Sequence, residues 1–140
     1  MTTLSRRFIA GGVVAGGVLL ATAAPALAHV TVHADDTSKG GFAEISFRVP
    51  TERDDASTVK VDVQIPTDHP IASVSTKPMA GWTATVTMSP LPKPITTDDG
   101  QVTQAVSEIV WTAGAGGGTK PGEFDDFVIS AGPLPDDVDS

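Results

Sequence analysis

The sequence predicts an all-β fold, an antiparallel sandwich or barrel, and three observations support this prediction. Short segments alternate apolar and polar residues with a period of two. Proline- and glycine-containing stretches separate these segments, and no segment has a convincing helical period. Successive side chains of a strand point to opposite faces, so this alternation is typical of strands with one face buried. Many such strands divided by turns favour an antiparallel sandwich or barrel.

The first three predicted strands cover residues 29–33, 42–49 and 59–65. In the first, Val30 and Val32 alternate with polar neighbours. In the other two, apolar residues occupy every second position and charged or polar residues the positions between. The apolar sets are Ala43, Ile45, Phe47 and Val49, then Val59, Val61, Val63 and Ile65. Each set is expected to face the core.

Three further strands are predicted at residues 82–88, 102–113 and 124–131. In the first of them, Trp82, Ala84, Val86 and Met88 alternate with three threonines. Prolines at positions 50, 66, 70, 78, 90, 92, 94, 121 and 133 fall between the predicted strands. Proline cannot donate a ladder hydrogen bond, so the strand that begins at Trp82 is expected to end before the proline at 90. Residues 114–118, rich in glycine, are expected to form a loop.

Residues 1–28 have the features of a cleavable signal peptide. Arg6 and Arg7 precede an apolar stretch at 9–20, and Ala26-Leu27-Ala28 forms a small-x-small cleavage sequence. The segment around the two arginines is similar to a twin-arginine export signal. The protein is therefore expected to be exported: secreted, periplasmic or associated with the cell envelope. No second hydrophobic stretch follows, so no C-terminal membrane anchor is expected in this chain.

The composition of the remaining 112 residues excludes several classes of partner. Two of the nine basic residues and none of the 17 acidic residues lie in the leader, which leaves a formal net charge of −10. Nucleic acids and anionic lipids need a basic surface, so neither is an expected partner. The chain has no cysteine. Any metal site must therefore use nitrogen and oxygen ligands.

Cleavage after Ala28 would make His29 the first residue of the mature protein. The free α-amine and the imidazole Nδ1 of an N-terminal histidine can close a six-membered chelate ring around one metal ion. Cu(II) prefers such nitrogen donors in a tetragonal plane. His33 lies roughly 13 Å further along an extended strand, which is too far to share that ion. His33 is instead expected to be a surface or auxiliary ligand, and His69 an exposed loop residue.

Several motifs resemble the YcnI family of bacterial copper-binding domains. They are His29-Val30-Thr31-Val32, Arg48-Val49-Pro50-Thr51-Glu52-Arg53, Pro66-Thr67-Asp68, Ile71-Ala72-Ser73-Val74, Gly81-Trp82 and Pro121-Gly122-Glu123-Phe124. The resemblance covers residues 29–135 and leaves an acidic tail at 136–140. It implies an exported immunoglobulin-like β-sandwich that binds Cu(II) at a brace built on one N-terminal histidine.

Carried over by position, the resemblance implies two metal ligands, His29 and Glu52. Glu52 matches the carboxylate of the family's site, although its charged surroundings also suit a solvated loop residue. A tryptophan from a later strand completes the family site, and this chain has no counterpart of that segment. Trp82 and Trp111 are expected to be core residues. The sandwich is accordingly expected to be incomplete at its C-terminus.

The expected function is capture or transfer of Cu(II) by a protein that is not an enzyme. The expected partners are the copper ion and other copper-handling exported or membrane proteins. One alternative is a copper-dependent oxidase that attacks polysaccharides, which would need a second nearby histidine and a flat aromatic surface. The other alternative is a metal-free interaction sandwich. Apart from the histidine, the chain has no catalytic motif such as a nucleophile elbow or a phosphate-binding loop.

Overall fold

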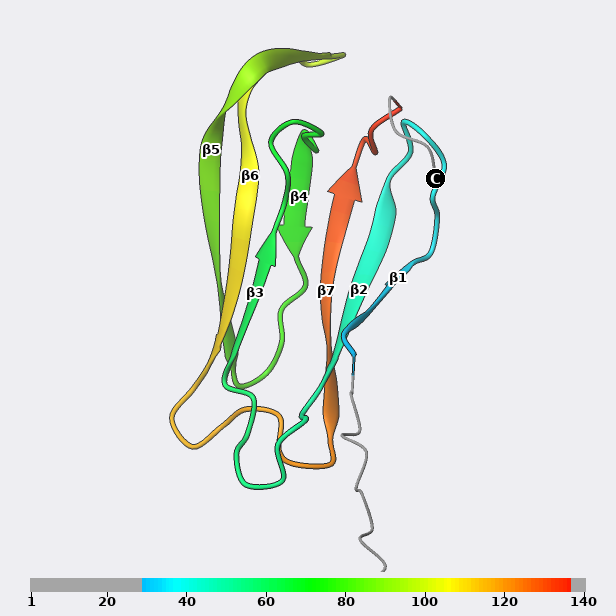
Figure 1. Cartoon of the computed structure of the whole chain (residues 1–140). Helices are drawn as coiled ribbons and strands as arrows, with labels where there is room; N and C mark the ends of the chain where they lie inside the picture. The colour runs from blue at the N-terminus through cyan, green and yellow to red at the C-terminus, as the bar shows by residue number, and fades with distance from the viewer. Residues whose placement is uncertain (1–28, 137–140) are drawn as a thin grey trace, which may run out of the picture.

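The computed structural model describes residues 29–136, which form seven β-strands and no helix (Figure 1). The signal peptide predicted at 1–28 and all but the first residue of the acidic tail lie outside the described residues. The strands are β1 (Thr31–Ala34), β2 (Ala43–Pro50), β3 (Lys60–Gln64), β4 (Ser73–Thr76), β5 (Trp82–Thr97), β6 (Gly100–Ala113) and β7 (Phe124–Gly132). No helix long and apolar enough to cross a membrane occurs in the described part.

The strands form two antiparallel sheets that pack as a sandwich. One sheet has four strands in the order β1-β2-β7-β4, and the other has three in the order β3-β6-β5. In the four-stranded sheet, β2 pairs over its full length with Phe124–Ala131 of β7, with Phe47 opposite Phe127. Figure 1 shows the far ends of β5 and β6 extending past the sandwich and bending over one end of it. The predicted all-β sandwich is confirmed.

The core lies between the central strands of the two sheets. Trp111 of β6 and Phe127 of β7 are 1% and 0% exposed, and their rings meet at a centroid distance of 5.5 Å. Trp82 of β5 packs edge-on against the same phenylalanine at 4.8 Å. Edge-to-face aromatic pairs contribute about 0.5–1.5 kcal/mol beyond their area burial. Trp111 is thus a core residue, as expected, and Trp82 is partly buried against the core.

The prediction that β5 ends before Pro90 is wrong, because the strand continues through Pro90, Pro92 and Pro94 to Thr97. The position of β5 in its sheet and an irregularity in its pairing explain how. β5 is an edge strand of the three-stranded sheet. Its register with β6 shifts between Pro90 and Ile95, and the residues between these two have no paired partner in β6. Proline is tolerated on edge strands and at bulges, because no ladder hydrogen bond of its own is lost there.

The sequence also failed to predict β4. This strand has four residues and one apolar side chain, Val74, so it offers no repeat of the alternating pattern. It pairs with β7, where Val74 lies opposite Ala131. The strand therefore depends on its partner in the sheet rather than on its own local pattern.

Candidate metal-binding site at the start of the domain

The structure brings the start of the domain close to the loop that carries Glu52. His29 and Val30 precede β1, and Glu52 follows the end of β2. Because β1 and β2 pair antiparallel, with Thr31 opposite Arg48, the start of β1 and the end of β2 lie at the same end of the sandwich. Val30 and Glu52 line one shallow depression of about 290 Å³. The two predicted ligands thus belong to neighbouring segments.

The backbone directly before Glu52 is fixed by hydrogen bonds of Thr51. The Thr51 N–H donates to Glu123 O at 3.0 Å, and its hydroxyl donates to Thr119 O at 2.8 Å. The same hydroxyl lies 3.0 Å from the Thr58 hydroxyl. These contacts join the Glu52 loop to the segment that leads into β7. The Glu52 side chain is exposed, but these hydrogen bonds hold the backbone next to it in place.

Thr119 anchors this network from inside the protein. It is 1% exposed, and its hydroxyl donates to the carboxylate of Asp125 at 2.5 Å. Its N–H and carbonyl both pair with Thr58. The adjacent Gly118 has a φ of +101°, and a Cβ there would meet the Thr58 carbonyl oxygen at 2.5 Å, so the close approach requires glycine. Sequence reasoning missed this network because threonines in a polar loop have no distinctive pattern.

Arg53, the basic residue next to Glu52 in sequence, does not pair with the Glu52 carboxylate. Arg53 donates through two nitrogens to the two oxygens of Asp55, each at 3.0 Å. These hydrogen bonds raise the pKa of Arg53 and lower the pKa of Asp55. Within residues 29–136, no ion pair or hydrogen bond joins the Glu52 side chain to another residue. An approaching cation therefore finds an exposed carboxylate.

The other two histidines are placed elsewhere. His33 lies opposite Ser46 in the β1–β2 pair, on the outer face of the sheet and further along β1 than the depression. His69 lies in the loop after β3, and β3 carries the chain from the Glu52 end of the sandwich to the opposite end. His33 is thus exposed at the surface and His69 is an exposed loop residue, as expected.

The described residues contain no cluster of three or more histidine, aspartate or glutamate side chains suited to a metal. The predicted donor set does not require one. It has two side chains, His29 and Glu52, and its third donor is an α-amine that exists only after cleavage at Ala28. This set of amine, imidazole and carboxylate fits Cu(II) better than a hard cation such as Ca²⁺, which prefers oxygen ligands.

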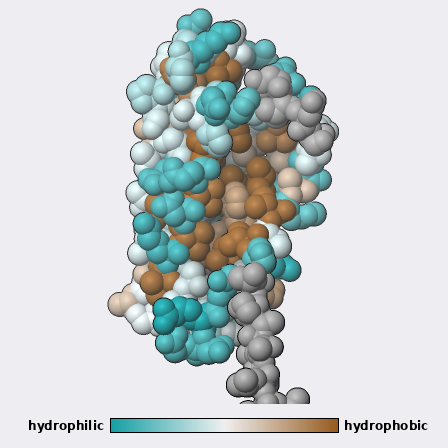
Figure 2. All heavy atoms as spheres, viewed as in Figure 1, coloured by the Kyte–Doolittle hydropathy of each residue, from teal (hydrophilic) through white to brown (hydrophobic). Residues whose placement is uncertain are grey.

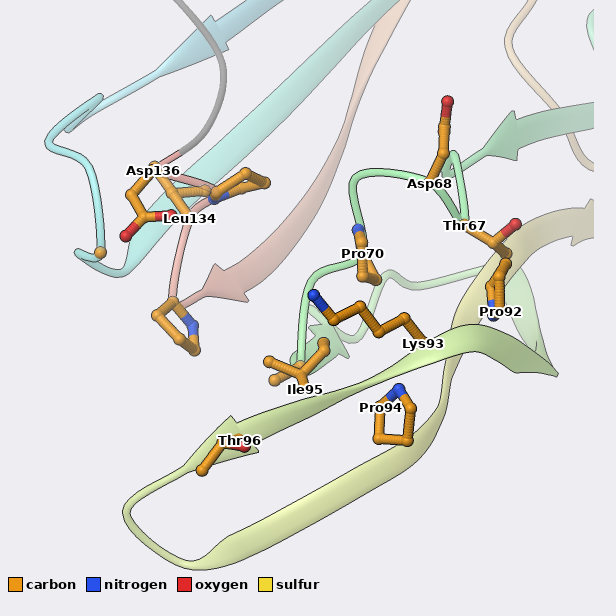
Figure 3. A pocket seen from close by; sticks show the side chains of 14 residues that line it. Thr67, Asp68, Pro70, Pro92, Lys93, Pro94, Ile95, Thr96, Leu134 and Asp136 are labelled. Carbon is orange, nitrogen blue, oxygen red and sulfur yellow. The ribbon is translucent and has the colours of Figure 1, made fainter.

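A larger hollow of about 740 Å³ lies at the opposite end of the sandwich. It is bounded by the loop before β4, by residues 92–96 of β5 and by residues 133–136. Figure 3 shows that Lys93 extends into the hollow while Asp68 points away from it. Prolines form much of the lining, and no histidine contributes to it. Converging metal ligands are therefore not found among its lining residues.

Comparison with known proteins supports the architecture. The model of the family described as "Domain of unknown function (DUF1775)" matches residues 29–140. The chain is similar to a solved protein from Nocardia farcinica, described as uncharacterized with an immunoglobulin-like fold. The two are 38% identical, with a TM-score of 0.58, and the match covers 76% of this chain and 67% of that one. No curated protein matches the chain.

Proposed function

The chain belongs to the DUF1775 family, the family of YcnI-like domains, and its fold is immunoglobulin-like. From this we propose that the domain beginning at His29 is an exported copper-binding protein that captures or passes on Cu(II). The ligands proposed are the α-amine and imidazole of His29 and the carboxylate of Glu52. In this role the protein carries Cu(II) and is not an enzyme.

One observation carries the proposal. Val30, the residue after His29, lines the same 290 Å³ depression as Glu52. The two segments flank the consecutive strands β1 and β2, and the β1–β2 pairing together with the Thr51 hydrogen bonds holds them at one end of the sandwich. Both proposed ligands are exposed, which suits a site that gives up its ion to a partner. The same end of the described domain has no second histidine, which disfavours the oxidase alternative.

The chemistry of the donor set predicts how binding depends on pH. A free α-amine has a pKa near ~8 and must lose its proton before it can bind a metal. Protons and copper therefore compete for the amine, and Cu(II) affinity is expected to rise with pH across the neutral range. A carboxylate is already ionised there and adds no such dependence.

The test compares the exported protein, processed so that it starts at His29, with the same protein acetylated at its α-amine. Acetylation converts the amine into an amide and leaves the folded domain unchanged. Cu(II) titration followed by electron paramagnetic resonance should show tight binding through the amine and imidazole nitrogens in the first form alone. At a free copper concentration 100 times Kd, binding should stabilise the fold by about 2.7 kcal/mol, seen as a rise in Tm.

Two side-chain variants complete the test. Glu52→Gln should weaken binding while the nitrogen coordination persists, and His33→Ala should leave binding unchanged. Equal binding by the processed and acetylated forms would disprove the brace. Failure of copper to change the Tm of either form would favour the metal-free interaction sandwich instead.

A further inference from the structure

The loop that carries Glu52 is closed at its base by contacts between threonines. Residues 51–59 connect β2 to β3, and residues 114–123 connect β6 to β7. Figure 1 shows the two connections side by side at the lower end of the sandwich. Thr51 and Thr58 lie near the two ends of the first connection, and both bind Thr119 of the second. Both ends of the Glu52 loop are therefore held at one residue.

The hydroxyl groups of these threonines form a chain that has one possible direction. A hydroxyl group carries a single proton. The Thr51 hydroxyl donates its proton to Thr119 O at 2.8 Å, so Thr58 is the donor in the 3.0 Å contact between the Thr51 and Thr58 hydroxyls. Loss of the Thr51 hydroxyl would break both hydrogen bonds at once. Thr51 is thus the central link between the two connections.

Thr119 can hold this chain because its own polar groups are all engaged. Its carbonyl oxygen accepts from the Thr51 hydroxyl and from the Thr58 N–H, which uses both lone pairs. Its N–H donates to Thr58 O, and its hydroxyl donates to Asp125. At 1% exposure, Thr119 cannot replace these partners with water. A broken contact would leave a buried polar group unsatisfied, which is costly.

A second hydrogen bond holds the backbone of Thr51. Its N–H donates to Glu123 O at 3.0 Å. Glu123 ends the turn of residues 120–123, in which its own N–H donates across the turn at 3.0 Å. Gly122 has a φ of +78° in this turn, a conformation that glycine adopts without strain. The amide and the hydroxyl of Thr51 are thus bound to the same connection, and together they set the direction in which the chain continues to Glu52.

Beyond Thr51 the loop faces water. Residues 52–55 are exposed, whereas residues 56–58 are partly buried. Figure 2 shows hydrophilic residues at the surface of this lower end of the molecule. The side chains of the Arg53–Asp55 ion pair are 72% and 73% exposed, so the pair adds little rigidity. The placement of the Glu52 backbone therefore depends on the threonine chain and not on contacts among the exposed residues.

This arrangement gives Thr51 a role in metal binding. We propose that Thr51 is a positioning residue, whose hydroxyl holds the Glu52 backbone in place for coordination of Cu(II) by the carboxylate. The inference rests on the proposed copper site. A loop that is ordered before the ion arrives loses less conformational entropy when its carboxylate binds. Folding, rather than copper binding, then supplies the free energy that orders the loop.

A double-mutant cycle tests this role in the exported protein processed to His29. Thr51→Val keeps the shape of the side chain and removes the hydroxyl, and it should weaken Cu(II) binding about tenfold, as expected for a residue that orients a metal ligand. In a Glu52→Ala background the same substitution should change the affinity by less than about twofold, because it acts through the carboxylate. Thr51→Ser retains the hydroxyl and should bind Cu(II) within about twofold of the native chain.

Hydrogen exchange of the copper-free protein, followed by NMR, gives a second measurement. Thr51→Val should speed exchange of the Thr58 N–H, which donates to Thr119 O, by about tenfold, and leave the amides between β2 and β7 unchanged. Thr97→Val is the matched control, because it removes a hydroxyl that donates to Gly100 O at the opposite end of the domain. This control should change neither the copper affinity nor the exchange of Thr58.

The outcomes separate this inference from the proposed function. Equal weakening by Thr51→Val in the native and Glu52→Ala backgrounds would overturn the positioning role. Unchanged affinity of Thr51→Val beside a clear loss in Glu52→Ala would overturn it as well, and so would unchanged exchange of the Thr58 N–H. Unchanged affinity of Glu52→Ala would instead remove Glu52 from the proposed copper site, and with it this role of Thr51.

Discussion

The closed and open sides of the sandwich are built from the same kinds of residue with the same alternation. On the closed side, Phe127 and Ile109 are fully buried between β6 and β7. On the open side, at β1 and β5, Val32 and Val86 point inward in the same cross-strand rows but remain 62% and 42% exposed. The difference teaches that alternation determines which face a side chain occupies. Whether that face is buried depends on what the other sheet places opposite it.

The largest expected effect comes from truncating the closed side. Phe127→Ala removes a ring that both tryptophans contact, and should lower the free energy of unfolding by about 3–5 kcal/mol. Val32→Ala, in the same cross-strand row, should lower it by no more than about 0.5 kcal/mol. Urea denaturation of both variants measures the contrast. Similar losses would show that the open side is covered in solution.

A smaller effect is expected from the buried network near the proposed copper site. Thr119→Val keeps the shape of the side chain but removes the hydroxyl that donates to Asp125, and should cost about 1–3 kcal/mol. The Glu52 loop depends on Thr119 through Thr51, so Cu(II) affinity should also fall. Thr83→Val, on the exposed face of β5, is the matched control and should change the stability by less than about 0.5 kcal/mol. Equal stability of the two variants would contradict the anchoring role of Thr119.

The smallest expected change in stability comes from an ion pair on the outer face of β2 and β7, between Arg48 and Asp126. Arg48 donates to both oxygens of Asp126, at 2.9 and 3.1 Å, and these hydrogen bonds lower the pKa of Asp126. A carboxyl group whose pKa is lower in the folded state stabilises the fold at any pH above its unfolded-state pKa. This stabilisation is lost as the pH falls through the folded-state pKa. Both side chains are more than a third exposed, so solvent screening keeps the contribution small.

Asp126→Asn tests this pH dependence. Relative to the native chain, the variant should lose a little stability at pH 7 and nothing at a pH below the lowered pKa. Urea midpoints measured at both pH values give the comparison. A loss of the same size at both pH values would mean that the carboxylate charge makes no contribution through Arg48.

The sequence predicts the fold well where the alternating pattern is long. Residues 42–49, 102–113 and 124–131 correspond closely to β2, β6 and β7, because each has apolar residues that face a real core. The pattern failed for β4, which is too short to repeat, and for β5, where prolines indicate a break but lie on an edge strand around a shift in its pairing with β6. Whether a strand lies at an edge depends on its neighbours in the sheet, and a single segment does not contain this information.

The candidate site is predictable to a lesser extent. His29 follows from the cleavage sequence alone, and Glu52 from a family motif. The threonines that hold the Glu52 loop come from three separate segments, at 51, 58 and 119, and none of them stands out in its own segment. Their importance arises from burial and from the register of the bridge between Thr58 and Thr119, both of which are properties of the folded chain.

The pairing of β2 with β7 has a consequence for the order of folding. Arg48 and Asp126 face each other across this pair although 78 residues separate them. At a synthesis rate of ~5–20 residues per second, β2 leaves the ribosome roughly 4–16 s before its partner exists. The β5–β6 hairpin is local and can form first, whereas loop closure between β2 and β7 comes late and is entropically costly. The four-stranded sheet, and with it the end that carries His29 and Glu52, is therefore assembled only after β7 has been synthesised.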